Sequence, residues 1–425
     1  MSHFSYNDGV LHAEGTALSA IAEQFGTPTY IYSKAALLKN FASYFDACHG
    51  RDALVCYAMK ANSNLAILDL LARKGAGFDI VSGGELLRVI AAGGDPGKVI
   101  FSGVGKSADE MRLALSHDIL CFNVESIPEL HRLNQIAGEM GKQAPVSLRV
   151  NPNVDAKTHP YIATGLKANK FGVAFDDALD TYRAAAQLPH LRVVGIDCHI
   201  GSQLLDDAPL LEALDKLIDL IDTLAAEGIH LHHVDIGGGI GIAYGEAGED
   251  DPVEVKAYLG RLFKRIDAWR FERHDGVPLK VIFEPGRSIV GNAGILLTRV
   301  EFIKPGAEKN FCVVDAAMND LMRPALYQAW MGVQPVVQSG SPALSYDVVG
   351  PICESGDWLA RDRQLAVEAG DLLAIMSAGA YGMTMASNYN TRGRPAEVIV
   401  DGERCHLVRK REMPADLFAL ESTIK

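Results

Sequence analysis

Short apolar runs recur along the first two thirds of the chain, and most of them precede a stretch with amphipathic helical spacing. Most of these runs lack a clean alternation of apolar and polar residues, which is typical of strands buried on both faces. We expect eight strands, at residues 53–58, 78–81, 99–101, 119–124, 146–150, 193–198, 233–236 and 279–283. The expected helices contain residues 65–71, 86–91, 111–115, 130–136, 178–186, 210–226 and 255–269.

Eight strands that alternate with helices over roughly 250 residues predict a (β/α)8 barrel, the TIM-barrel architecture. The competing structure is a doubly wound parallel sheet, which usually has fewer strands and carries a glycine-rich turn after its first strand. Here the first strand is followed by Lys60-Ala61-Asn62-Ser63, which lacks that glycine pattern. The sequence therefore favours the barrel.

Beyond about residue 290 the apolar runs become strand-like and are separated by turns. The expected strands are at residues 295–303, 311–314, 344–349, 372–376, 397–400 and 404–408. Asp401-Gly402-Glu403 separates the last two and predicts a hairpin loop. A further strand is expected at residues 29–32. The sequence predicts a barrel domain at residues 34–290 and a β-rich barrel or sandwich domain formed by residues 1–33 and 291–425.

Composition narrows the classes of partner. Of the 425 residues, 48% are hydrophobic and 22% are charged, so we expect a globular protein. The net charge of −13 argues against nucleic acid and anionic membranes as partners, and no apolar run is long enough to span a bilayer. The seven cysteines are scattered without a CxxC pair, which argues against a disulfide framework or a zinc site. We therefore expect a cytoplasmic protein without a bound metal.

Polar residues and glycines gather after the expected strands. In a (β/α)8 barrel, catalytic residues lie at the carboxyl ends of the strands. The residues at these positions are Lys60, Asp79, Ser82, Asn123, Glu125, Arg149, Asn151, His199, Gly201, Ser202, Gly237–Gly239 and Glu284–Arg287. Each has an ordinary structural explanation by itself, but their common face predicts an active site. The roles of Asp79, Asn123, Glu125 and Arg149 stay open, because these residues would equally serve to shape the barrel mouth.

Lys60 and Glu284 are the most informative of these residues. Desolvation at a strand end disfavours the charge of a lysine and makes its amine nucleophilic, although a surface lysine is the ordinary alternative. The eighth strand closes against the first, so we expect Glu284 beside Lys60. The two would form an ion pair or hold a ring between them. A carboxylate beside a pyridine nitrogen shifts its pKa by about 1–3 units and keeps it protonated.

The remaining candidates suggest a phosphate and a planar ring. Gly237–Gly239 follow the seventh strand, where barrel loops commonly bind phosphate through backbone N–H groups, and Ser202 would add a hydroxyl donor. His199 stands among small residues, as suits an aromatic ring that stacks on a planar cofactor. A lysine for an imine, glycines for a phosphate, a carboxylate for a ring nitrogen and a stacking histidine together indicate pyridoxal 5'-phosphate.

Motifs along nearly the whole chain resemble those of the alanine-racemase-like, fold-type III pyridoxal-phosphate enzymes, and within them the diaminopimelate decarboxylases. The motifs shared with ornithine and arginine decarboxylases are Tyr57-Ala58-Met59-Lys60-Ala61-Asn62, His199-Ile200-Gly201-Ser202-Gln203, Gly237–Gly239 and Glu284-Pro285-Gly286-Arg287. More selective are His159–Gly165, continuing to Asn169–Gly172, and Cys353-Glu354-Ser355-Gly356-Asp357. Glu354 stands where polyamine-type enzymes usually carry aspartate, and Ala163 stands where a serine is expected.

The resemblance implies a role for each matching residue. Lys60, Cys353 and His199 would be the catalytic residues, with Lys60 carrying the cofactor as an imine. The residues that would bind the cofactor are Lys60, His199, Ser202, Gly237, Gly238, Gly239, Glu284, Pro285, Gly286, Arg287 and Tyr381. Those that would bind the substrate are Arg287, Arg323 and Tyr327 at its distal carboxylate, Glu354 at its distal ammonium, and Tyr381. Arg323 and Tyr327 are four residues apart, which places both on one helical face.

The implied reaction is decarboxylation of meso-2,6-diaminopimelate to L-lysine and CO2, the last step of lysine biosynthesis by the diaminopimelate route. Cys353 from the partner subunit of a homodimer, or a water, would deliver the final proton. Decarboxylation of ornithine, arginine or carboxynorspermidine is an alternative, but these substrates lack the same distal amino-acid group. Racemisation would need an opposed second base, for which the sequence offers no clear candidate. A non-catalytic pyridoxal-phosphate carrier or regulatory homologue is a further alternative, although such proteins tend to lose the catalytic groups that this chain keeps.

Overall fold

The computed structural model describes residues 3–155, 165, 169–245, 253–272 and 278–424. The chain divides into two compact units. The barrel unit consists of residues 41–241 and 252–286, and the β unit consists of residues 1–40, 242–251 and 287–425. The first forty residues therefore belong to the same unit as the C-terminal third of the chain.

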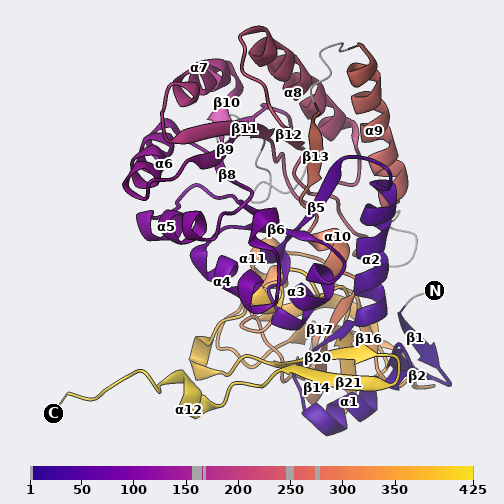
Figure 1. Ribbon diagram of the computed structural model, residues 1–425. Helices are drawn as coiled ribbons and strands as arrows, with labels where there is room; N and C mark the ends of the chain where they lie inside the picture. The colour runs from indigo at the N-terminus through magenta and orange to yellow at the C-terminus, as the bar shows by residue number, and fades with distance from the viewer. Residues whose placement is uncertain (1–2, 156–164, 166–168, 246–252, 273–277, 425) are drawn as a thin grey trace. The chain divides into compact units, whose positions relative to one another are not determined.

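The barrel unit contains a closed ring of parallel strands surrounded by helices (Figure 1). Around the ring its strands are β5 (Ala53–Ala58), β6 (Gly77–Ile80), β7 (Val99–Phe101), β8 (Cys121–Val124), β9 (Ala144–Asn151), β11 (Leu191–Asp197), β12 (His233–Asp235) and β13 (Lys280–Phe283). Pairing of β13 with β5 closes the ring. The predicted (β/α)8 barrel and its eight strands are confirmed. A two-residue strand, β10 (Val173–Ala174), pairs with β9 outside the ring and is too short to show a sequence period.

Helices follow most of the barrel strands. They are α2 (Lys34–Ala47), which leads into β5, then α3 (Leu65–Ala72), α4 (Gly83–Ala91), α5 (Ala108–Ser116), α6 (Ile127–Glu139), α7 (Phe175–Ala186), α8 (Ala208–Ala226) and α9 (Val255–Glu272), with the 3₁₀ turns η1 (Met59–Ala61) and η2 (Pro96–Lys98). Serine side chains cap the N-termini of three of these helices. Ser82 and Ser126 cap α4 and α6, and Ser107 forms a capping box with Glu110 at α5. These caps fix where each loop at the carboxyl ends of the strands stops.

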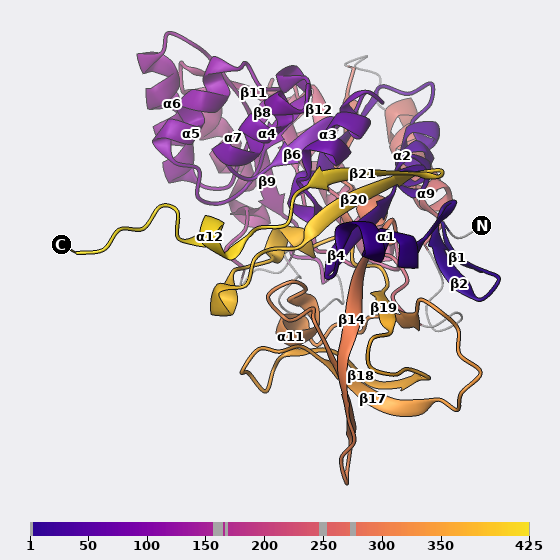
Figure 2. The ribbon, with the colours of Figure 1, turned by 90° about the horizontal axis from the view of Figure 1, so that it is seen from below.

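The β unit is built around a mixed sheet in the order β18-β17-β15-β14-β4-β20-β21. Its strands are β18 (Trp358–Leu365), β17 (Leu344–Val349), β15 (Asn310–Val314), β14 (Gly294–Lys304), β4 (Thr29–Ser33), β20 (Ala396–Asp401) and β21 (Arg404–Arg409), with β19 (Leu372–Ile375) and β16 (Val333–Pro335) off this path. Figure 2 shows the long strand β14 and the β20–β21 hairpin. The predicted hairpin turn is confirmed, and Gly402 has the positive φ of 63° that such a turn requires.

Smaller elements complete the β unit. These are β1 (Phe4–Asn7), β2 (Val10–Ala13), β3 (Thr16–Ala17), α1 (Leu18–Phe25), α10 (Arg287–Val290), α11 (Arg323–Tyr327), η3 (Met383–Met385), η4 (Tyr389–Thr391) and α12 (Pro414–Leu417). The sequence did not predict β18, because Arg361-Asp362-Arg363 interrupts its apolar pattern. Pairing with β17 forms the strand despite these charges. One core cluster joins Leu11, Ile21, Ile31, Leu297 and Val400, so residues from both ends of the chain pack together.

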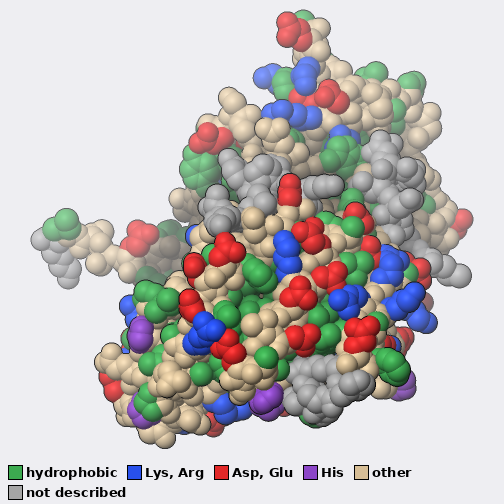
Figure 3. Space-filling model, turned by 90° about the horizontal axis from the view of Figure 1, so that it is seen from above, with side chains coloured by type: hydrophobic (Ala, Val, Ile, Leu, Met, Phe, Trp, Pro, Cys, Tyr) green, Lys and Arg blue, Asp and Glu red, His purple; other side chains and the backbone are tan. Residues whose placement is uncertain are grey.

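The surface carries charges of both signs. Figure 3 shows acidic and basic side chains interspersed on one face. Surface ion pairs such as Arg112–Glu139 at 3.0 Å and Arg183–Glu227 at 2.5 Å join neighbouring elements, although exposed pairs of this kind stabilise little. Within the described ranges, none of the helices combines the length and apolar character needed to cross a bilayer. All seven cysteines are free.

Candidate active site

Lys60 lies in η1, directly after β5. Its ammonium forms an ion pair with the carboxylate of Asp79, near the end of β6, whose side chain is fully buried. Strand register explains this contact, because Asp79 pairs with Ala58, two residues before Lys60. The sequence predicted a carboxylate beside Lys60 but named Glu284. Strand β13 pairs with β5 as expected. Lys60, however, forms its ion pair with Asp79 on β6, the strand on the other side of β5.

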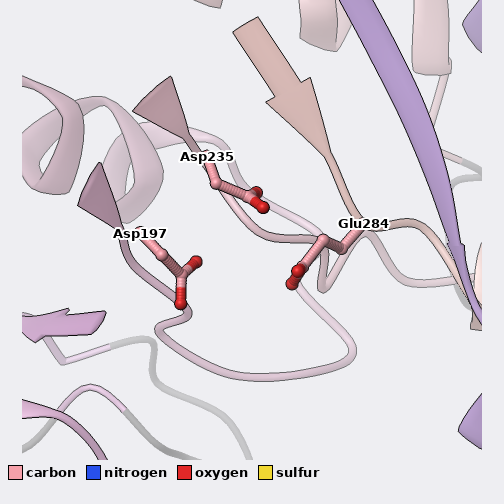
Figure 4. Close-up of side chains that lie close together, drawn as sticks. All are labelled: Asp197, Asp235 and Glu284. Carbon is pink, nitrogen blue, oxygen red and sulfur yellow. The ribbon is translucent and has the colours of Figure 1, made fainter. Parts of the chain in front are cut away.

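Three buried carboxyl groups converge inside the barrel mouth. Asp197 ends β11, Asp235 ends β12 and Glu284 follows β13, and their side chains point toward one another (Figure 4). One carboxylate oxygen from each lies within 4.8 Å of the others. Burial, followed by repulsion from Asp235, raises the pKa of Asp197 and of Glu284 well above their ordinary values, and Lys60 only partly opposes the rise at Glu284. Burial also raises the pKa of Asp235, to about 7.

Glu284 was predicted from the sequence as a member of the site, whereas Asp197 and Asp235 were not. A signal was present, because consecutive barrel strands end on an acidic residue, and parallel strands bring such ends together. One oxygen of each residue (Oδ1 of Asp197, Oδ2 of Asp235 and Oε1 of Glu284) has no hydrogen-bond partner among the described residues. A buried unpartnered carboxylate oxygen is costly, so this cluster is suited to a cationic or proton-donating ligand.

We expect Asp235→Asn to change how stability depends on pH in the cofactor-free protein. The folded-state pKa of Asp235 is raised, so the folded state binds more protons than the unfolded state between about pH 4 and pH 7, and stability falls as pH rises through this window. Each pKa unit corresponds to about 1.4 kcal/mol. Thermal unfolding from pH 4 to 8 should therefore show a smaller loss of Tm in Asp235→Asn than in the unmodified protein. Asp46→Asn, on an exposed turn of α2, is the control; equal slopes for both variants would contradict the raised pKa.

A hydrogen bond joins His199 to the glycine run Gly237–Gly239. The backbone N–H of Gly238 donates to His199 Nδ1 at 3.3 Å, and that of Gly237 donates to Asp235 Oδ1 at 2.8 Å. Burial, then the charges of Arg149 and Lys60, lowers the pKa of His199 well below its ordinary value, so its ring is neutral at pH 7. A Cβ at Gly238 would clash with the carbonyl oxygen of Glu284. Only glycine lets the ends of β11, β12 and β13 approach this closely.

These bonds change how the glycine run can bind a phosphate. The sequence predicted that backbone N–H groups of Gly237–Gly239 bind a phosphate, but Gly237 and Gly238 use theirs within the protein. The N–H of Gly239 donates to no acceptor among the described residues. Gly239 has φ 96°, a conformation that glycine adopts without strain. Ser202 lies three residues after His199 and is partly exposed.

Two residues without a predicted role brace the barrel mouth. Glu125 accepts backbone N–H groups of Gly103 and Gly172, each at 2.9 Å, and meets Arg149 Nη1 at 3.4 Å. The Arg149 guanidinium also lies 4.9 Å from the centre of the Phe171 ring. One buried carboxylate thus joins the loops that follow three strands. Asn123 behaves similarly, since its side-chain amide donates to Ser102 Oγ at 3.3 Å.

A second cluster lies in the β unit and contains two buried arginines. Arg287 Nη1 donates to Tyr244 Oη at 2.6 Å, and its guanidinium lies 4.8 Å from the ring centre of Tyr381. The Arg323 guanidinium lies 4.4 Å from the ring centre of Tyr244. Burial and the charge of Arg287 lower the pKa of Arg323. Arg323 forms no ion pair with a carboxylate in the described part of the chain, so this cluster is suited to an anionic ligand.

The helix predicted from the spacing of Arg323 and Tyr327 is present as α11. Tyr327, the last residue of this helix, is partly exposed. Tyr244 was missed by the sequence analysis, because it stands in an irregular segment after the glycine run and no pattern connects it to the arginines. It is the aromatic side chain between them.

Cys353 and Glu354 lie on an exposed loop of the β unit, after β17. Glu354 accepts a hydrogen bond from Tyr389 Oη at 2.5 Å. The selective motif at His159–Thr164, including Ala163, lies outside the described residues.

Comparisons with known proteins agree with this arrangement. A family described as "Pyridoxal-dependent decarboxylase, pyridoxal binding domain" matches residues 35–291. The diaminopimelate decarboxylase of Pseudomonas aeruginosa is 58% identical over 424 residues, covering 100% of both chains. This chain belongs to the diaminopimelate decarboxylase family. A crystal structure of the family member from Helicobacter pylori, complexed with L-lysine, has a TM-score of 0.89 and 43% identity over 95% of this chain and 99% of that one.

A solved structure of a different decarboxylase is less similar. The lysine decarboxylase of Selenomonas ruminantium shares the fold with a TM-score of 0.80, but only 26% identity over 90% of this chain and 95% of that one. The identity to the diaminopimelate decarboxylases is higher, in agreement with the family expected from the sequence.

The residues of the barrel unit fit the pyridoxal phosphate that this family binds. A buried oxygen of Glu284 has no partner among the described residues, as a protonated ring nitrogen would require. His199 is a neutral aromatic ring, and Gly239 offers an N–H for a phosphate oxygen. Lys60 is partly exposed, which its amine needs in order to reach an aldehyde. The donor set therefore matches the chemistry of the cofactor.

Proposed function

We propose that this protein decarboxylates meso-2,6-diaminopimelate to L-lysine and CO2, the last step of lysine biosynthesis by the diaminopimelate route. Full-length identity of 58% to a diaminopimelate decarboxylase carries the proposal. The two buried arginines support it, because the substrate has a second carboxylate at its distal end and ornithine has none. Retention of Lys60, Glu284 and Cys353 argues against a non-catalytic homologue.

The cofactor would be held by Lys60, His199, Ser202, Gly237–Gly239, Glu284–Arg287 and Tyr381. When bound, pyridoxal phosphate supplies an electron sink for the carbanion left by loss of CO2. Asp79 Oδ2 accepts a hydrogen bond from Lys60 Nζ and so orients the Lys60 side chain. Glu284, supported by Asp197 and Asp235, holds a proton at the barrel mouth. Converging carboxyl groups also suit a divalent cation, but the match of Glu284 to the family motif favours the cofactor.

The substrate's distal end would be bound in the β unit. We assign its carboxylate to Arg287, Arg323 and Tyr327, and its ammonium to Glu354. Arginine forks match a carboxylate in charge and geometry. Tyr381 would contact both cofactor phosphate and substrate. The free energy of binding at this end can be used to orient the reacting end.

The test is CO2 release by pure protein from meso-diaminopimelate, with ornithine, arginine and lysine as controls. We expect turnover only with diaminopimelate. Faster release from ornithine or arginine would replace the substrate assignment, and cofactor binding without CO2 release from any diamino acid would favour a carrier or regulatory homologue. We further propose that the protein is cytoplasmic, which its seven free cysteines support.

We also propose a homodimer in which Cys353 of one subunit serves the active site of the other. The exposed position of Cys353 in the single chain supports this assignment. Mixing Lys60→Ala with Cys353→Ala protein, after unfolding and refolding together, should restore about a quarter of normal activity, because random pairing makes half the dimers mixed and each has one intact site. Activity assays of the mixture and of each variant alone check this. Absence of recovery would contradict a shared site, and full activity of Cys353→Ala would favour a water as proton donor.

A further inference from the structure

We propose that Tyr389 is a positioning residue that holds the Glu354 carboxylate in place for the substrate's distal ammonium, and thereby contributes to substrate specificity. This inference rests on the proposed function, in which Glu354 binds that ammonium. Tyr389 belongs to none of the motifs identified from the sequence.

The contact between the two side chains is short and specific. Tyr389 Oη donates to Glu354 Oε1 at 2.5 Å. Hydrogen bonds from a neutral hydroxyl to a carboxylate are short and stronger than those between neutral groups. In the described part of the chain, no other side chain hydrogen-bonds to Glu354, which leaves Oε2 for a ligand. This bond and the charge of Glu354 raise the pKa of Tyr389, so the phenol remains a donor at neutral pH.

The loop that carries Glu354 has a rigid centre. Asp357 is buried, and its two carboxylate oxygens accept the N–H groups of Met318 and Ile352, each at 2.7 Å. The N–H of Asp357 in turn donates to the carbonyl oxygen of Glu354 at 3.0 Å. The backbone of Glu354 is therefore fixed, whereas its side chain is exposed. An exposed glutamate samples several rotamers unless a partner selects one.

The segment that carries Tyr389 is rigid as well. Asn388 Nδ2 donates to Arg392 O at 3.0 Å and to Glu412 Oε2 at 2.8 Å, and Arg392 Nη2 reaches Asp315 O at 2.5 Å. Thr391 has φ 56°, which is rare for a β-branched residue and persists only where the surroundings enforce it. The enforced turn directs Tyr389 to Glu354. Tyr389 is 45% exposed in the single chain, so burial does not account for the position of its side chain.

Because both backbones are fixed, the hydrogen bond from Tyr389 selects one rotamer of the Glu354 side chain. A carboxylate held in place before binding loses less entropy when it meets an ammonium. The ordinary alternative is a surface bond that ties two loops together and affects stability only. If Tyr389 positions Glu354, loss of this hydrogen bond should weaken the binding only of ligands that carry the distal ammonium. If the bond only ties two loops together, its loss should not distinguish between ligands.

The experiment compares holoenzyme carrying Tyr389→Phe with the unmodified holoenzyme. We expect KM for meso-diaminopimelate to rise by about 3–10-fold, the size of one such hydrogen bond, with kcat changed less than twofold. Competitive inhibition by L-lysine, which carries the same amino-acid group, should weaken by a similar factor. Inhibition by 6-aminohexanoate, which lacks that ammonium, should not change. In a Glu354→Gln background, Tyr389→Phe should have little further effect.

Tyr6→Phe is the matched control, because Tyr6 Oη also donates a 2.5 Å hydrogen bond in the β unit, to Pro335 O. Tyr6→Phe should lower Tm about as much as Tyr389→Phe does. It should leave the inhibition constants of L-lysine and 6-aminohexanoate unchanged. An unchanged KM in Tyr389→Phe, or equal weakening of both inhibitors, would overturn the positioning role. If the unmodified protein released no CO2 from diaminopimelate, the proposed function itself would be wrong. These two failures are therefore distinguishable.

Discussion

Replacing Lys60 by alanine should abolish decarboxylation of diaminopimelate, with kcat/KM lowered by at least about 10³-fold. Among the described residues Lys106 is the one buried lysine, and its amine is not available as a substitute because it donates to Gly103 O, Asn123 O and Glu129 Oε1 at 2.7–2.8 Å. The variant should also lose the visible absorbance of protein-bound cofactor. Steady-state assays and an absorbance spectrum check both expectations.

The buried Asp79 provides a way to separate two roles of Lys60. Lys60→Ala leaves the Asp79 carboxylate without its ion-pair partner, which should also lower Tm. Lys60→Arg keeps a cation there but supplies no nucleophilic amine. It should recover much of the Tm and none of the activity. Activity in Lys60→Arg, or an unchanged cofactor spectrum in Lys60→Ala, would contradict the assignment of Lys60.

Replacing Arg323 by methionine should lower kcat/KM for diaminopimelate by about 10²–10³-fold, mainly through KM. Loss of one member of a charged, hydrogen-bonded pair in a binding site costs about 2–5 kcal/mol, and methionine removes the charge while filling similar volume. The reaction of the cofactor with a small amine should be unaffected. Initial rates over a wide range of substrate concentration check the expected rise in KM.

In Arg323→Met we expect the thermal stability to be kept although the activity falls. Arg323 is buried near another buried cation, and burial, followed by the charge of Arg287, lowers its pKa. Replacing buried charges by apolar side chains of similar size is often neutral or stabilising. We therefore expect Tm to stay equal or to rise. A lower Tm with normal KM would show that Arg323 is structural rather than substrate-binding.

The barrel was predictable because its strands are buried on both faces and leave continuous apolar runs. The predicted runs at 53–58 and 99–101 coincide with β5 and β7, and the other six overlap a barrel strand to within two residues at each end. The strand β18 was not predictable in this way. Its Arg361-Asp362-Arg363 centre has no apolar period, and the strand exists because β17 offers it a ladder of hydrogen bonds.

The candidate site shows a similar division. Position after a strand was enough to predict Lys60, His199 and Glu284, because parallel strands end on one face. The residues that contact the site side chains or shift their pKa values were harder to predict. Asp79 was noticed without a role, Asp197 and Asp235 were missed, and Tyr244 had no signal at all. Side-chain pairing depends on direction and distance inside the barrel, which spacing along the chain does not contain.

The position of β4 has a consequence for synthesis on the ribosome. Residues Thr29–Ser33 pair with Gly294–Leu297 on one side and with Ala396–Val400 on the other. At about 5–20 residues per second, β4 waits roughly 20–75 s for its last partner to be made. The barrel strands, at residues 53–283, emerge in the interval and can assemble first. An unpaired β4 is a strand with two open edges during that time, so nascent chains stalled before residue 396 should depend on chaperones more than the finished protein does.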